Sequence, residues 1–274
     1  MWLRSVVVHE VTMTTLADLR ALPHTSISQV RTFLLCPRKY FLHYVAKSPP
    51  AWRPLALIFG SAWHESIGAH LIEPMSIEAL QSHLRDGLAR GIGSDGPPVL
   101  FEEDAQDEGQ VIDLSLRMLA IFLTRVPRPA KVLAVELPFA LELAHPATGE
   151  VLDVPLIGAI DALVDEAGTR VWELKTAKKK WSQDQLDFDL QMTGYGMAAR
   201  SLGCGDAALE ILVTTKTKIP DVQVTSLVRH RRDENELLAT VFGVRQAIAA
   251  GVDYPLRGWQ CRTCAHAGAC GSRA

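Results

Sequence analysis

The amino-acid sequence predicts an α/β protein with a mixed β-sheet, a helical N-terminal part and a cysteine-rich C-terminal tail. Three observations predict this class. The first half of the chain carries apolar residues at helical spacing. The second half contains short apolar runs of strand type, which are divided by turn residues and interrupted by a helix. The end of the chain then gathers Cys261, Cys264 and Cys270.

The helical part begins at Ser26 or Ser28, either of which can cap a helix, and Pro37 can open a second helix that runs through Tyr44. A mostly apolar helix is predicted over 55–72. Two more helices are predicted over 76–90 and about 108–125, and the loop between them, 91–98, is rich in Gly, Pro and Asp.

The strand-rich part begins with three predicted strands, which are joined by turns at 146–149 and 166–168. A helix over about 184–200 follows, then two more strands, and then a helix over about 233–250. The predicted strands cover 131–143, 151–164, 170–175, 208–215 and 222–229. This order of strands and helices favours a mixed sheet that is covered by helices.

Composition and charge exclude several classes of protein. The chain has 274 residues, of which 48% are hydrophobic and 22% charged, as is typical of a globular protein with a sizeable core. The net charge of −3 means that binding to nucleic acid needs a local basic groove. No apolar run is long enough to span a membrane, and the N-terminal apolar run is too short for a signal peptide, so we expect a cytoplasmic protein. A P-loop of the kind that ATP motors use is also missing.

The cysteines form a set that is divided between the two ends of the chain. Cys36 lies near the N-terminus, and Cys261, Cys264 and Cys270 lie in the tail, whereas Cys204 has the setting of an ordinary core residue. Disulfides are rare in a reducing cytosol, so metal binding or a catalytic role is the better interpretation of the four. The spacing alone leaves zinc and an iron–sulfur cluster both open.

Charged residues interrupt two apolar strands in the centre of the sequence. Glu173 and Lys175 are two apart and therefore project from the same face of a strand, with Leu174 packed behind them. Asp161, at the end of the preceding strand, can lie beside them. Two carboxylates and a backbone carbonyl suit Mg²⁺ or Mn²⁺, and a nearby lysine can stabilise charge that develops on a phosphate. The alternatives are an ordinary cross-strand ion pair and an Asp that favours a turn.

Two helices carry further candidates for this site. Gln191 and Tyr195 are four apart on one helix and share a face, from which both can donate hydrogen bonds. Taken alone, they can equally be a packed tyrosine and its polar neighbour. His64 lies in the apolar helix and can supply an imidazole ligand, although a single histidine is commonly a packing or surface residue.

Six motifs of this chain together resemble those of the PD-(D/E)xK nuclease superfamily, and specifically its RecB-like branch with an iron–sulfur cluster. That branch includes the nuclease domain of AddB and the iron–sulfur exonucleases associated with CRISPR adaptation. The motifs occur in order over 26–270: Ser26-x-Ser28 before Cys36-Pro37, Gly60-x3-His64, Gly158-x2-Asp161, Glu173-x-Lys175, Gln191-x3-Tyr195, and Cys261-x2-Cys264-x5-Cys270. Ile160 stands where the name of the superfamily has a proline.

The resemblance implies a restriction-endonuclease-like core and a role for each matched residue. His64, Asp161 and Glu173, with the carbonyl of Leu174, become ligands of Mg²⁺ or Mn²⁺, and Lys175 becomes the catalytic lysine. Gln191 and Tyr195 contact the substrate or support the site, and Glu136 is a further candidate. Cys36, Cys261, Cys264 and Cys270 become ligands of a [4Fe–4S] cluster.

The predicted organisation is one composite domain in four parts. Residues 1–25 form an N-terminal extension, and 26–130 form the helical region with the first cluster cysteine. Residues 131–230 form the nuclease core, and 231–274 form the last helix and the iron–sulfur tail. A strong metal–thiolate clip would hold the weakly packed tail against the N-terminal helices.

Three basic runs are candidates for contact with the phosphates of DNA, unless they are simply solvated faces. Trp181, beside one run, can stack on an unpaired base. The runs comprise Lys178, Lys179 and Lys180, then Arg231 and Arg232 with the neighbouring Arg229, and finally Arg38 with Lys39.

The sequence therefore predicts a metal-dependent DNA exonuclease that hydrolyses phosphodiester bonds in DNA repair, recombination or CRISPR adaptation. We expect DNA that is single-stranded or has free ends as its substrate, and a helicase or CRISPR integrase on a separate chain as its partner. The alternative is an inactive DNA-binding or scaffold protein that has the nuclease fold and a four-cysteine metal site.

Overall fold

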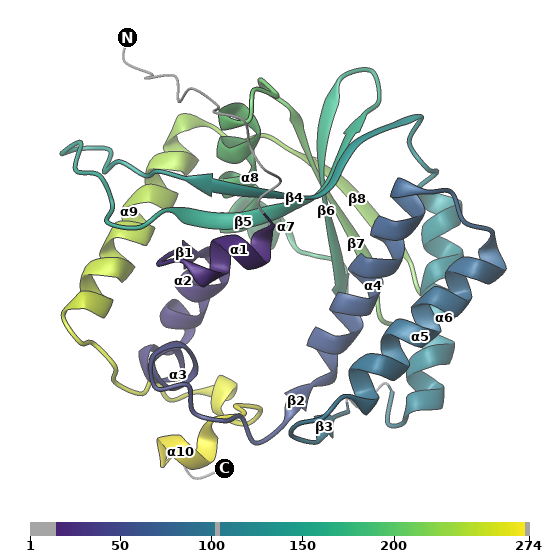
Figure 1. The fold of residues 1–274 in the computed structure, drawn as a ribbon, viewed down its shortest axis with the longest axis horizontal. Coiled ribbons are helices and arrows are strands. Elements are labelled where there is room, and N and C mark those ends of the chain that lie inside the picture. The colour runs from purple at the N-terminus through teal and green to yellow at the C-terminus, as the bar shows by residue number, and fades with distance from the viewer. Residues whose placement is uncertain (1–14, 102–104, 272–274) are drawn as a thin grey trace.

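The structure is a computed structural model that describes residues 15–101 and 105–271. At its centre lies a six-stranded mixed sheet with helices on both faces (Figure 1). This confirms the predicted fold class. The strands are β1 (Thr25–Ser26), β4 (Lys131–Leu141), β5 (Leu156–Asp165), β6 (Thr169–Ala177), β7 (Ala208–Thr215) and β8 (Val222–Leu227). Their order is β1-β5-β6-β7-β8, and β4 also pairs with β5.

Strand β5 is only partly paired along one of its edges. Its partner β6 is antiparallel and pairs with it only over 162–165, whereas β4 pairs with β5 over 156–165. At the other end of β5, the short parallel strand β1 pairs with Leu156 and Ile157. Residues 158–161 of β5 therefore lie in a gap between β6 and β1, where the sheet leaves room for other contacts.

Two hydrophobic cores cover the two faces of the sheet. The first core includes residues of α2 (Ile27–Leu35), α8 (Leu190–Ser201) and α9 (Arg231–Ala249). The second includes residues of α4 (Leu55–Ile72), α5 (Ile77–Gly93) and α6 (Glu108–Arg125). In Figure 1 the two groups of helices lie on opposite sides of the molecule, with the sheet between them.

Short elements connect these layers. They are α1 (Leu16–Ala21), α3 (Pro37–Tyr40), the π-helix η1 (Phe41–Val45), β2 (Arg53–Pro54), β3 (Val99–Leu100), α7 (Gln183–Asp187), the 3-10 helix η2 (Trp259–Cys261) and α10 (Ala267–Cys270). The C-terminal tail returns to the side of α3 (Figure 1), where the backbone N–H of Arg38 donates to the carbonyl of Tyr254 at 3.1 Å. The C-terminal tail is thus in contact with the N-terminal helical part.

Most of the predicted elements are present, with some differences at their ends. The hydroxyl of Ser26 caps α2 through the N–H of Gln29 at 3.2 Å, and Pro37 opens α3 as predicted. The helix predicted over 184–200 is two helices, because Asp189 turns its side chain back to cap α8 through the N–H of Met192 at 2.9 Å. The strand predicted from 151 begins at Leu156, directly after Pro155, whose lack of an N–H weakens a strand.

The predicted N-terminal extension is described only in part. Residues 1–14 lie outside the described residues, and the remainder contains α1 and the first residue of β1. The sequence did not predict α1, although Thr15 and Asp18 form a capping box at its start. Among the helices that the structure describes, none combines the length and hydropathy that crossing a bilayer requires.

Candidate active site

The gap in the sheet contains the buried carboxylate of Asp161. Asp161 lies one residue beyond the last Cα pair of β5 and β6, Ala162 with Trp172, and is 8% exposed. There its Oδ2 accepts a hydrogen bond from the backbone N–H of Leu174 at 2.7 Å. The backbone of β6 therefore orients this carboxylate, and Oδ1 remains for another contact.

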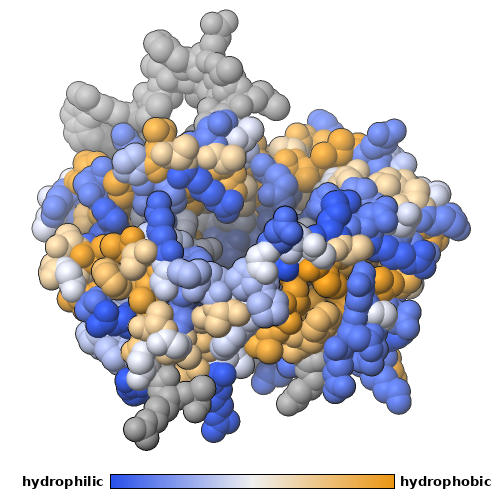
Figure 2. All heavy atoms as spheres, turned by 60° about the horizontal axis from the view of Figure 1, so that its bottom comes forward, coloured by the Kyte–Doolittle hydropathy of each residue, from blue (hydrophilic) through white to orange (hydrophobic). Residues whose placement is uncertain are grey.

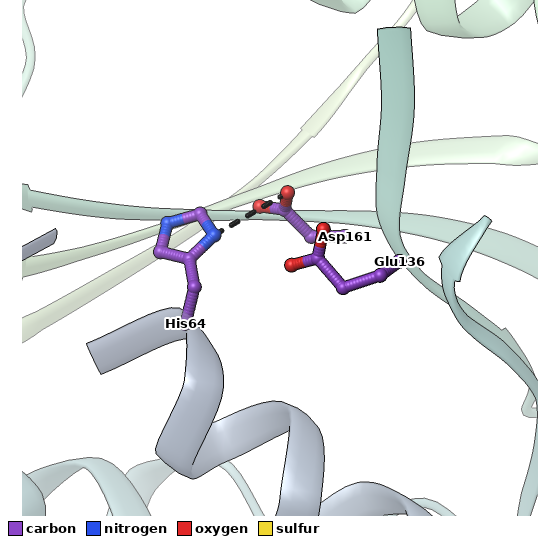
Figure 3. A group of neighbouring side chains, drawn as sticks. All are labelled: His64, Glu136 and Asp161. Carbon is purple, nitrogen blue, oxygen red and sulfur yellow. Dashed lines mark ion pairs between the residues drawn. The ribbon is translucent and has the colours of Figure 1, made fainter. Parts of the chain in front are cut away.

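His64 reaches Asp161 from the second layer of helices. Its neighbour Trp63 and Ile67 are 1% exposed and fix α4 in the core. The Nδ1 atom of His64 lies 3.4 Å from Oδ1 of Asp161 (Figure 3). Burial acts to lower the pKa of His64, but the hydrogen bond and charge of Asp161, with the charge of Glu173, outweigh burial and raise it.

Glu136 approaches the same point from β4. It faces Asp161 across the strand pair, between the Cα pairs Val135 with Ala162 and Leu137 with Ile160. Its φ of 50° is a left-handed backbone conformation that is rare for a glutamate within a strand and occurs often at functional sites. Three ligand atoms, one from each of His64, Glu136 and Asp161, lie within 4.8 Å of one another (Figure 3). Burial and the charge of Asp161 raise the pKa of Glu136.

Glu173 and Lys175 project together from β6, as their spacing predicts. The carboxylate of Glu173 is fully buried, and Lys175 is in ion-pair contact with it. Apart from this ion pair, the carboxylate oxygens accept no hydrogen bond of ordinary geometry. Burial, followed by the charge of Asp161, raises the pKa of Glu173 to about 8, although Lys175 and His64 act to lower it. Glu173 lies outside the group of three close ligand atoms, because its carboxylate is turned to Lys175.

A chain of hydrogen bonds leads from Lys175 to the backbone of β5. The Nζ of Lys175 donates to Oε1 of Gln191 at 3.0 Å, and Nε2 of Gln191 donates to Oη of Tyr195 at 2.8 Å. The hydroxyl of Tyr195 then donates to the carbonyl of Ala159, in the gap of the sheet. Burial raises the pKa of Tyr195 well above its usual value, so the phenol stays protonated and can donate.

Gly158 makes room for this chain. A Cβ at this position would lie 2.5 Å from Cζ of Phe139, whose ring packs edge-on against Tyr195 with centroids 5.9 Å apart. The glycine of the Gly158-x2-Asp161 motif therefore has a packing role, which brings an aromatic ring close to the backbone of β5.

Comparisons with known proteins agree with this geometry. A family model described as "PD-(D/E)XK nuclease superfamily" matches residues 24–271. The chain belongs to the PD-(D/E)XK nuclease superfamily. Its fold is also similar to a crystal structure from Eubacterium rectale named "Putative exonuclease", at 15% identity, with a TM-score of 0.56 over 97% of this chain and 94% of that one.

Two other comparisons add little to the superfamily assignment. The structure of SSO0001 has a TM-score of only 0.39 at 15% identity, over 61% of this chain and 75% of that one, and therefore carries no argument. No curated protein gave a significant match. The superfamily makes the protein a nuclease, which is a hydrolase, and its name describes the Asp161 and Glu173-x-Lys175 pattern except for the proline.

The site has the features that a divalent cation requires. Three ligand atoms of suitable type converge, and a fully buried glutamate beside them has Lys175 as its ion-pair partner and no other hydrogen bond of ordinary geometry. Oxygen and imidazole donors of this kind bind Mg²⁺ or Mn²⁺. The residues present therefore fit the group that the superfamily implies. The group of three close ligand atoms differs from the predicted set in one respect, because it contains Glu136 and not Glu173.

The four predicted cluster cysteines line one cavity. Cys36, Cys261, Cys264 and Cys270 border it together with Lys39 and residues of the segment 255–260. The Sγ of Cys36 also accepts the N–H of Leu256 at 3.4 Å. Cys204 lies elsewhere and packs against the first core, as the sequence predicts.

The predicted basic runs lie at the surface, and several of their members are already paired. Lys178, Lys179 and Lys180 follow β6, and Lys180 forms an ion pair with Asp221 at 2.6 Å. Arg231 and Arg232 begin α9, where Arg232 pairs with Glu236 at 3.0 Å. Trp181 is half-buried against the first core, and its backbone N–H donates to Oε1 of Gln223 at 2.8 Å, so its stacking on a base stays a prediction.

Sequence analysis missed one basic residue near the site. Arg20 of α1 lies close enough to Glu136 for its charge to lower the pKa of that carboxyl, against the stronger effect of burial. The signal that can find it is the capping box that begins at Thr15, because this box predicts a helix in the segment otherwise taken as an extension.

Proposed function

We propose that the protein is a metal-dependent DNA exonuclease whose tail is held by an iron–sulfur cluster. The observation that carries the proposal is the convergence of His64, Glu136 and Asp161 in a gap of the sheet, beside the ion pair of Glu173 and Lys175. A fully buried carboxylate is costly to a fold, and a bound cation would add to the compensation that this ion pair provides.

The protein's own residues then have distinct roles in phosphodiester hydrolysis. Asp161, oriented by the N–H of Leu174, would hold the cation with His64 and Glu136, and Glu173 with the carbonyl of Leu174 would complete its shell. When bound, a cation here supplies Lewis-acid chemistry toward the scissile phosphate. Lys175 would turn its ammonium toward the phosphate as charge develops on its oxygens.

Gln191 and Tyr195 are positioning residues in this proposal. Gln191 accepts from Lys175 and donates to Tyr195, so its amide links the lysine to the carbonyl of Ala159 through one continuous chain. In this proposal the hydrogen bonds hold the ammonium of Lys175 near the gap in the sheet. They do so even when the carboxylate of Glu173 gains or loses a proton or binds a cation. A lysine on four flexible carbons would otherwise spend much of its time away from this position.

The iron–sulfur part of the proposal rests on the resemblance of the cysteine motifs. Cys36, Cys261, Cys264 and Cys270 line one cavity, where four thiolates could bind a [4Fe–4S] cluster or a zinc ion. Metal analysis of the purified protein distinguishes the two.

Action on strand ends is supported by the shape of the molecule and by its neighbour. Figure 2 shows that the face bearing the tail is hollowed near its centre. A recessed site admits a single strand or a free end more readily than continuous duplex. The similar structure from Eubacterium rectale is itself named a "Putative exonuclease". A helicase or CRISPR integrase on a separate chain, and a role in repair or CRISPR adaptation, remain parts of the proposal.

The test compares the purified protein with Asp161→Asn on labelled DNA in the presence of Mn²⁺ or Mg²⁺. The substrates are linear single strands, linear duplexes and closed circles of each. We expect digestion of linear DNA by the wild type, no digestion of circles, and no activity of Asp161→Asn. The matched control is Asp165→Asn, on the exposed end of the same strand, which should stay active. Binding of DNA without cleavage would favour the scaffold alternative instead.

The cluster is tested separately. Protein that is purified without oxygen should contain iron and acid-labile sulfide in equal amounts and should absorb visible light. Zinc in place of iron would contradict this part of the proposal and leave the nuclease assignment intact.

A further inference from the structure

A groove runs along the exposed side of α4 and ends at the candidate metal ligands. Its cavity has a volume of about 550 Å³ and is lined by Ala56, Leu57, Gly60, Ser61, His64, Glu65 and Glu136. All but the last belong to α4, at the spacing of three and four that places residues on one face of a helix. The volume is in the range of pockets that hold a small molecule or one nucleotide.

Gly60 lies in the middle of this groove, and no contact with the described residues requires a glycine there. A Cβ at Gly60 would meet nothing within 4 Å, so the fold leaves the position open. Glycine inside a helix is less stable than alanine, because it loses more conformational freedom on folding.

Two other glycines of α4 and α5 have a packing reason, whereas Gly93, the last residue of α5, has none. A Cβ at Gly68 would lie 3.1 Å from Val135, and one at Gly91 would lie 2.5 Å from Cγ2 of Ile58. At these two positions the helix pair uses glycine where its own atoms approach closely. At Gly60 the described residues leave the space open, so it is available to a ligand.

The walls of the groove suit part of a nucleotide. Leu57 is 68% exposed and offers an apolar surface to a base or a deoxyribose. Ser61 is exposed and offers a hydroxyl that can donate to a phosphate oxygen. The carboxylate of Glu65 is paired with Arg90 at 2.8 Å, which reduces its repulsion of a phosphate.

We propose that the groove binds the nucleotide next to the scissile phosphate, with the sugar–phosphate backbone lying directly against Gly60. This inference rests on the proposed nuclease function and adds to it a residue that determines how closely a strand approaches His64. Any side chain at position 60 would point into the groove and lift the strand away from the metal ligands, while α4 itself would remain intact.

The test uses Gly60→Ala and Gly60→Leu, since alanine and leucine both favour helices. Gly243 is the matched control, because it is exposed within α9 and a Cβ there also meets nothing within 4 Å. The same two substitutions at Gly243 should raise Tm by about 1–3 °C, as they should at Gly60.

Activity separates the two positions. We expect Gly60→Leu to lower kcat/KM on single-stranded DNA roughly 10- to 100-fold, with a smaller loss for Gly60→Ala and none for Gly243→Leu. The rise in Tm on addition of Mn²⁺ should be the same in Gly60→Leu and wild type, which shows that the ligands are undisturbed.

Failure of this inference differs from failure of the proposed function. Wild-type cleavage with an equally active Gly60→Leu would overturn the groove and leave the nuclease assignment in place. If the wild type cleaves no DNA, the proposed function is wrong, and fluorescence anisotropy with a labelled single-stranded oligonucleotide then decides the groove. Equal affinity of wild type and Gly60→Leu would reject it, and weaker binding by the variant alone would support it.

Discussion

Neutralising Glu173 should make the metal-free protein more stable at alkaline pH. The carboxyl group is fully buried with Lys175 as its ion-pair partner, and its pKa is raised from 4.5 to about 8, chiefly by burial and then by the charge of Asp161. At pH 6 the carboxyl group of Glu173 has lost its proton in the unfolded chain, whereas the folded protein still binds this proton. Glutamine at this position cannot titrate and preserves the shape of the side chain.

The magnitude follows from proton linkage. Between pH 4.5 and about 8 the folded state binds the proton more strongly than the unfolded state, so the free energy of unfolding falls as pH rises. The slope is at most about 1.4 kcal/mol per pH unit, and the loss over the window is on the order of 4 kcal/mol. Glu173→Gln removes this loss. At about 2–4 °C per kcal/mol, its Tm relative to wild type should rise by roughly 10 °C from pH 5 to pH 8.

The assay is thermal unfolding of both proteins in EDTA, in half-unit steps from pH 5 to 8.5. Asp165→Asn, on the same sheet but at the surface, serves as the control and should follow the wild type. Excess Mn²⁺ should then raise the Tm of the wild type more at pH 8 than at pH 6, since a cation competes with the proton, and should affect Glu173→Gln less. Curves of Tm against pH that run parallel for wild type and Glu173→Gln would refute the reasoning.

Three further predictions concern other parts of the molecule. Lys175→Met should lower cleavage about 10²- to 10⁴-fold at unchanged Tm in Mn²⁺, and a rate within twofold of wild type would contradict the role of the ammonium. Cys36→Ser should lose the visible absorbance and melt at a lower temperature, whereas Cys204→Ser should keep both; retained absorbance in Cys36→Ser would exclude it as a ligand. Gly158→Ala should destabilise the protein by about 1–3 kcal/mol in denaturant unfolding, because the new Cβ meets the ring of Phe139. Unchanged stability would show that this ring moves aside freely.

Much of the fold could be predicted because the local signals agree with the tertiary structure. The apolar runs that became β5, β6 and β7 are long and lie in the centre of the sheet, so burial and strand pattern point to the same result. The two-residue strand β1 was not predictable from local sequence. It forms because β6 pairs with only one end of β5, and the other end, far away in the sequence, is then available to pair with β1. The division at Asp189 also escaped prediction, because a capping residue inside a helical pattern looks like an ordinary polar residue.

The candidate site was partly predictable for a similar reason. Glu173 and Lys175 share a face of one strand by simple alternation, and the structure retains that relation. Glu136 is different, because its side chain reaches Asp161 through a left-handed backbone conformation that no strand pattern encodes. The pairing of His64 with Asp161 likewise depends on how α4 packs on the sheet, which spacing does not reveal.

Two buried glutamates on neighbouring strands show why Glu173 indicates a function and not a fault of packing. Glu210 of β7 is 7% exposed, and its carboxylate binds Arg170, accepts the indole N–H of Trp172 at 2.9 Å, and accepts the hydroxyl of Ser226 at 3.3 Å. This sheet can therefore satisfy a buried carboxylate completely with its own side chains. Glu173 is more deeply buried, yet it has only the ion pair with Lys175. The same sheet thus surrounds the carboxylate of Glu210 with three partners and gives that of Glu173 one ion pair, which leaves Glu173 with capacity for a further ligand.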